Sequence, residues 1–117
     1  MSLGRGDPVA PPPVAGEFDV RFATKDAVSG WQDLCRQAPG NTRRAWDEMR
    51  TNPAPFPPTE RHHRLRFDLA SAVHQGRELP QWQLEVTGGG RVWYLFDQEK
   101  RVCWLKLAKV GHPRKTD

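Results

Sequence analysis

The chain has 117 residues, with 18 lysines and arginines against 14 acids, a net charge of +4 and a pI near 9.5. This length predicts one domain with a modest core. Hydrophobic residues make up 37% of the chain and the mean hydropathy is −0.76. Since no apolar run approaches the roughly 18 residues of a transmembrane helix, a membrane-spanning protein is excluded. The positive charge mildly favours a polyanionic partner.

The first residues and the cysteines favour a cytoplasmic location. The opening segment, MSLGRGDPVAPPPVAG, lacks the apolar stretch of a secretory signal. Cys35 and Cys103 lie in apolar surroundings and are expected to be buried free thiols in a reducing compartment, with a single disulfide as the alternative.

The N-terminal half predicts an arm, a strand and two helices. Residues 1–16 are rich in proline and glycine, which is typical of a flexible, dispensable arm outside the core, so residues 17–117 form the domain. Residues 17–22 alternate as a short strand does. Thr24 is placed to cap a helix over residues 25–37, whose apolar side chains follow at helical spacing.

A second helix completes a helical hairpin. It is expected to begin at Asn41 or Thr42, after the sequence APGN, and to end in TNPAPFPP because proline removes a backbone donor. Further on, residues 64–67 are expected to be extended. A helical turn and a loop should follow, broken by Gly76 and Pro80.

The C-terminal half predicts an antiparallel meander. Residues 82–86 and 91–97 alternate as strands joined by a TGGG turn that tolerates positive φ, and residues 101–110 return across the sheet. Helices early and strands late indicate an α+β fold: an N-terminal strand and a helical hairpin packed on a mainly antiparallel four-stranded sheet. The second face of that sheet should be open to solvent.

The open face is predicted to carry polar groups able to bind phosphate and move protons. Gln83, Glu85, Arg91 and either Lys106 or Lys109 share it, and His112 and Arg114 lie beyond the last strand. Arginine suits a pair of phosphoryl oxygens, and histidine exchanges protons near neutral pH. The alternative is that these are merely solvated charges. Trp93 shares the face with Arg91 and is placed to stack on a base.

No metal or cofactor site is expected. Neighbouring residues on a strand point to opposite faces, so His62 and His63 make a poor metal pair. Gly88 to Gly90 precede a strand rather than a helix, and therefore do not form a phosphate cradle at a helix N-terminus.

The order of these elements resembles the RelE/ParE superfamily of bacterial toxins from type II toxin–antitoxin systems. The likeness covers residues 17–117 and is carried by HRLRFDLA, RVWYLFD and the terminal VGHPRKTD. It implies the RelE/ParE-like fold and, for RelE-like members, an endoribonuclease without a metal that cuts mRNA in the ribosomal A site. Attack by a 2′-OH leaves a 2′,3′-cyclic phosphate. The implied partners are the ribosome, mRNA and a cognate antitoxin.

The resemblance also implies roles for particular residues. Arg91 matches a strand-opening arginine that stabilises the phosphate, His112 lies near the terminal acid–base position, and Glu85 takes the place of a base. The expected phosphate or RNA contacts are Arg64, Arg66, Lys109, Arg114 and Lys115.

Some positions depart from the superfamily's pattern. Several relatives use a C-terminal tyrosine, whereas here Tyr94 is the only tyrosine and alternates onto the core face. Gln83 and Glu85 stand where some members carry lysines. Two alternatives therefore stay open: a ParE-like inhibitor of DNA gyrase that acts by protein contact, and a non-catalytic, degenerate binding module.

Overall fold

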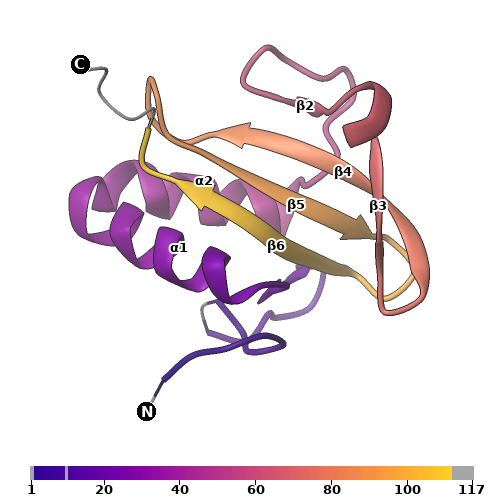
Figure 1. Ribbon diagram of the computed structural model, residues 1–117, viewed down its shortest axis with the longest axis horizontal. Helices are drawn as coiled ribbons and strands as arrows, with labels where there is room; N and C mark the ends of the chain where they lie inside the picture. The colour runs from indigo at the N-terminus through magenta and orange to yellow at the C-terminus, as the bar shows by residue number, and fades with distance from the viewer. Residues whose placement is uncertain (1, 10, 112–117) are drawn as a thin grey trace.

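Two helices pack on one face of a mixed, mostly antiparallel six-stranded sheet in the computed structural model, which describes residues 2–9 and 11–111 (Figure 1). The α+β class and the helical hairpin are confirmed, while the expected four strands are too few. Within the described ranges, neither helix has the length and apolar character needed to cross a membrane.

The helices follow the capping signals in the sequence. Helix α1 (Lys25–Gln37) begins as predicted, since the Thr24 hydroxyl accepts a 3.0 Å hydrogen bond from the backbone N–H of Ala27. Helix α2 (Pro39–Thr51) begins earlier than expected. Proline at the first helical position lacks only a donor that would be unpaired there anyway, so the APGN segment separates the helices with a single residue, Ala38.

The sheet has the order β1-β6-β5-β4-β2, with β3 on another part of β4. The first and last strands pair in parallel, and the remaining pairs are antiparallel. The strands are β1 (Asp19–Phe22), β2 (His62–Arg64), β3 (Ser71–His74), β4 (Arg77–Glu85), β5 (Arg91–Asp97) and β6 (Val102–Lys109).

The middle of the chain differs most from the prediction. Strand β2 lies about two residues earlier than expected, and Phe67–Leu69 form a 3₁₀ turn, η1. Gly76 was predicted to break the structure, but it forms the turn of a hairpin between β3 and β4. Gln75 and Gly76 both have positive φ, at 54° and 80°. A two-residue turn of this kind matches the twist of paired strands, so a breaker in sequence becomes a connector in the sheet.

Alternate residues of the strands point to opposite faces of the sheet, and they belong to two separate hydrophobic clusters. Those facing the helices, including Leu84, Tyr94 and Leu105, join the main cluster. On the other face, Leu79, Leu95 and Trp104 belong to a smaller cluster packed with Ala72 of β3. The second face is therefore only partly open, and its open portion lies toward the β4–β5 turn.

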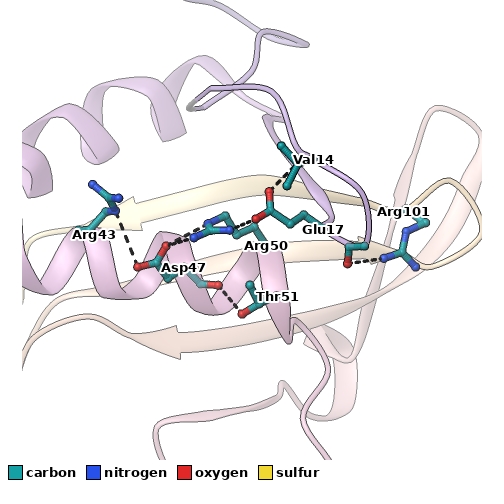
Figure 2. Close-up of polar contacts among 8 residues, drawn as sticks. Val14, Glu17, Arg43, Asp47, Arg50, Thr51 and Arg101 are labelled. Carbon is teal, nitrogen blue, oxygen red and sulfur yellow. Dashed lines mark hydrogen bonds and ion pairs between the residues drawn. The ribbon is translucent and has the colours of Figure 1, made fainter.

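The N-terminal segment is joined to the domain rather than lying outside its core. Leu3 and Val9 pack against the main cluster, and the N–H of Val9 donates to the carbonyl of Val20 in β1 at 2.8 Å. Further along the segment, the N–H of Val14 donates to the carboxylate of Glu17 at 3.1 Å, and that carboxylate forms an ion pair with Arg50 of α2 (Figure 2). The proline-rich composition misled the prediction, because a segment with few donors still covers the free edge of β1.

Helix α1 approaches β6 so closely that Gly30 has no room for a side chain. A Cβ there would lie 1.8 Å from the Ala108 carbonyl oxygen, whereas one at Gly40 in α2 would meet nothing within 4 Å.

We predict that Gly30→Ala lowers the free energy of unfolding by about 1–3 kcal/mol through overpacking. Gly40→Ala is the matched control, and it should be neutral or slightly stabilising because alanine favours helix. Urea denaturation of both variants measures this. Equal stability of the two variants would show that α1 does not rest on β6 as described.

Candidate functional site

A cross-strand pair of opposite charge marks the open end of the sheet. Glu85 ends β4, Arg91 begins β5, and the two are register partners. Their neighbours Leu84 and Val92 face the helices, so Glu85 and Arg91 share the other face. Side chains directly opposite on one face have Cβ atoms roughly 4.5–5.5 Å apart, so Glu85 and Arg91 are neighbours. The guanidinium of Arg91 donates to the Gly89 carbonyl oxygen at 3.4 Å rather than to the Glu85 carboxylate.

Two further cations extend this pair across the sheet. Lys109 of β6 is the register partner of Arg91 and is exposed. On the other side, the Nε atom of Arg61 lies 3.7 Å from a carboxylate oxygen of Glu85. Among the described residues, Arg91 and Lys109 form no ion pair. The row Arg61–Glu85–Arg91–Lys109 thus carries one acid and three cations.

Glycine is needed in the turn between Glu85 and Arg91, but not for the positive φ that the sequence predicted. Neither Gly88 nor Gly90 has a positive φ. A Cβ on Gly90 would instead lie 2.6 Å from the Val110 carbonyl oxygen, so glycine is needed because β6 passes close by. An open hollow of about 220 Å³ adjoins this turn, lined by Gln83, Glu85, Gly88, Gly89, Gly90 and Arg91.

A second row of side chains lies beside the first. The indole N–H of Trp93 donates to the amide oxygen of Gln83 at 2.8 Å, and both side chains are half-buried. His63 of β2 is the register partner of Gln83 and shares its face. Its Nδ1 atom lies 2.8 Å from the carbonyl oxygen of Arg64, which can only accept, so Nδ1 carries a proton.

The predicted contacts Arg64 and Arg66 lie apart from the Glu85–Arg91 pair. Both are exposed, and they line a larger open hollow of about 640 Å³ together with His63 and Leu69. The guanidinium of Arg64 donates to the Ala70 carbonyl oxygen at 2.8 Å. The structure therefore brings together Glu85, Arg91 and Lys109. Arg64 and Arg66 instead line a separate hollow next to His63.

Three predicted residues, His112, Arg114 and Lys115, lie outside the residues that the structure describes. The last described residue is Gly111, where a Cβ would be 3.7 Å from the Gly89 carbonyl carbon. The described chain therefore ends beside the hollow at the β4–β5 turn.

The only tyrosine is inside the protein, as its alternation predicted. Tyr94 is 0% exposed, and its hydroxyl donates to the Pro53 carbonyl oxygen. The Nε2 atom of His62 lies 2.5 Å from that hydroxyl, and its Nδ1 atom lies 3.2 Å from the Glu48 carboxylate. This network ties α2 and the loop that follows it to β2 and β5, so Tyr94 is a structural group.

Burial governs the shifted pKa values of the described groups. It raises the pKa of the Tyr94 hydroxyl and lowers the pKa of His62, although Glu48 partly offsets the second effect. Burial also raises the pKa of the Cys103 thiol well above its usual range. Cys35 was expected to be buried but is exposed, and both cysteines are free thiols. Partial burial also raises the pKa of the Cys35 thiol, with Arg36 acting in the opposite direction, so neither thiol is disposed to form a reactive thiolate.

Arg61 and His63 were missed as members of the site. The sequence-based strand began at Arg64, which left both residues in a loop. The signal that sets the true register is His62, a buried polar residue that hydrogen-bonds to Tyr94. Period-2 alternation cannot reveal it, because histidine is ordinarily only intermediate in burial.

The open end of the face has groups for phosphate binding and proton transfer. Arginine and lysine can hold phosphoryl oxygens, a carboxylate can accept a proton, and an imidazole can do either. Within residues 2–9 and 11–111, no group of three or more His, Cys, Asp or Glu side chains is arranged to hold a metal ion.

Comparisons of the chain with protein-family models, with curated proteins and with solved structures find no match.

The Tyr94 hydroxyl gives a stability prediction. Tyr94→Phe removes the donor to Pro53 and leaves that buried carbonyl and His62 without their partner, so the free energy of unfolding should fall by about 1–3 kcal/mol. Thr51→Ala removes an exposed hydroxyl that also donates to a carbonyl, and should change it by less than about 0.5 kcal/mol. Urea denaturation measures both. A Tyr94→Phe protein as stable as wild type would contradict the network.

Proposed function

We propose that this protein is the RelE-like toxin of a type II toxin–antitoxin system and cleaves mRNA on the ribosome. The observation that carries the proposal is the Glu85–Arg91 pair, which sits on the open face with two more cations and beside a hollow. A pair of this kind combines a proton acceptor with a phosphate clamp. An inhibitor that acts only by protein contact needs neither.

In the proposed reaction, the Glu85 carboxylate removes the proton from a ribose 2′-OH. The 2′ oxygen then forms a bond to the adjacent phosphorus as the bond from phosphorus to the 5′ oxygen breaks. A proton passes to that leaving oxygen, giving a 2′,3′-cyclic phosphate and a free 5′-OH. Arg91 stabilises the charge that develops on the phosphoryl oxygens, with Lys109 next to it.

His112 is the proposed donor of the proton to the leaving oxygen. Support comes from its position directly after Gly111, which lies beside Gly89 at the edge of the hollow. His63 is the described imidazole nearest to the same row, through its partner Gln83.

Arg61, Arg64, Arg66, Arg114 and Lys115 are proposed to contact RNA phosphates of the message or the ribosome. Such contacts depend on charge and are weakened by salt. The proposed antitoxin is a small protein whose acidic or amphipathic segment covers this basic face when the toxin is inactive.

Cleavage is tested by adding purified protein to a cell-free translation reaction and mapping mRNA ends. Wild type should produce new 5′ ends in translated messages. Arg91→Ala should slow cleavage by about 10²–10³-fold, the usual cost of losing one donor to a developing oxyanion. Glu85→Gln and His112→Ala should also slow it. Arg36→Ala, which removes an exposed arginine from α1, should cleave like wild type.

Intact mRNA in a reaction where wild type still stops translation would make the ribonuclease proposal wrong. A parallel assay with DNA gyrase separates the main alternative: accumulation of cleaved DNA complexes, with intact mRNA, would indicate a ParE-like inhibitor. A protein without effect in either assay would be a non-catalytic member.

A further inference from the structure

Phe67 combines an unusual backbone with an exposed ring. It is 90% exposed, and its φ is 57°. A positive φ is uncommon for any residue with a side chain and is an outlier for a bulky one, whereas glycine adopts it freely. The position therefore suits glycine for folding, and the benzyl group adds nothing to the core.

The loop around Phe67 is held by its neighbours. The Ala70 N–H donates to the Phe67 carbonyl oxygen at 3.0 Å, and the buried Gln81 side chain donates to the Leu69 carbonyl oxygen at 2.8 Å. Arg64 binds the Ala70 carbonyl oxygen. A ring on a fixed turn loses little freedom on binding, which favours recognition of a flat partner.

The charges beside the ring favour a nucleic acid. Arg66 precedes Phe67 and is exposed, and Arg64 is the last residue of β2, just before this loop; both line the hollow of about 640 Å³. Among the charged residues that line this hollow, the two arginines outnumber the one acid, Glu60, while Asp68 follows Phe67 on the loop. Arginines hold phosphates, while an exposed ring offers a stacking surface that every base can use.

This hollow is linked to the row proposed for cleavage through one pair of cross-strand neighbours. His63 lines it, and its partner Gln83 lines the hollow at the Glu85–Arg91 pair. We propose that Phe67 stacks on an unpaired base of a single-stranded RNA whose adjacent phosphates are held by Arg64 and Arg66. This deepens the proposed function by adding a binding position away from the reacting phosphate.

The test uses a short 2′-O-methyl RNA, which cannot form the cyclic phosphate, labelled with 2-aminopurine. Wild type should bind it and quench its fluorescence by stacking. Phe67→Gly should bind about 5- to 100-fold more weakly, the range expected for one base–aromatic contact. Phe67→Trp should bind at least as well as wild type.

Stability and a matched control keep the result interpretable. Phe67→Gly should melt at the same or a higher temperature, since glycine fits the positive φ. Phe56→Gly removes a ring that is 96% exposed in another loop and should leave RNA affinity unchanged. An equal loss of RNA affinity in Phe56→Gly would overturn the inference. Wild-type affinity and quenching in Phe67→Gly would also overturn it, and would indicate that the ring contacts a protein partner instead.

The binding test and the cleavage test have independent outcomes, so either proposal can be rejected while the other stands. Phe67-dependent binding without mRNA cleavage would uphold the inference and reject the nuclease. Cleavage that survives together with unchanged RNA affinity in Phe67→Gly would do the reverse.

Discussion

The contact between α1 and β6 decides which face of the sheet is available. Gly30 lets the helix backbone come against the Ala108 carbonyl, and the apolar side of α1 covers the strands behind it. Every alternate strand residue on that side is then committed to the core. The residues between them, Glu85, Arg91 and Lys109, must face away from the helices.

Part of the second face of the sheet is also covered. The β3–β4 hairpin brings Leu79 and Ala72 over one end of that face, where Leu95 and Trp104 are buried. The end near the β4–β5 turn is not covered in this way, and it keeps Glu85, Arg91 and Lys109 in contact with solvent. One acid among three cations, with a tryptophan fixed by Gln83 next to them, is a surface suited to a phosphate and a base.

The burial of Tyr94 limits which side chains can act as acid and base at this face. The hydroxyl of Tyr94 is held by Pro53 and His62 in the core, so this tyrosine cannot act on a substrate at the open face. The proposal instead assigns proton removal to Glu85 and proton donation to His112. A carboxylate and an imidazole are a sufficient pair for general acid–base catalysis.

Local patterns were enough to predict α1, its Thr24 cap, β5 and the side of the sheet that Glu85 and Arg91 occupy. They failed where long-range pairing decides the structure. The parallel pairing of β1 with β6 joins the two ends of the domain, which no local period reports. The β3–β4 hairpin was missed because Gly76 signals a break as well as a turn, and β2 was displaced because its register depends on buried His62.

Those errors explain what was missed in the site. With β2 misplaced, Arg61 and His63 could not be assigned to either face of the sheet. The exposure of Phe67 and its positive φ could not be predicted from composition. The shared face of Glu85 and Arg91 was predictable because alternation along each strand is a local pattern.

The central claim is that the Glu85–Arg91 end of the open face binds an RNA phosphate, and NMR titration with uridine 2′,3′-cyclic monophosphate tests it most directly. The account predicts shifts of the Trp93 indole N–H and of the Gly89 and Arg91 amides, with little change in the indole signals of Trp31 and Trp46 on the helical side. Shifts confined to the helices, with Trp93 and Arg91 unmoved, would contradict it.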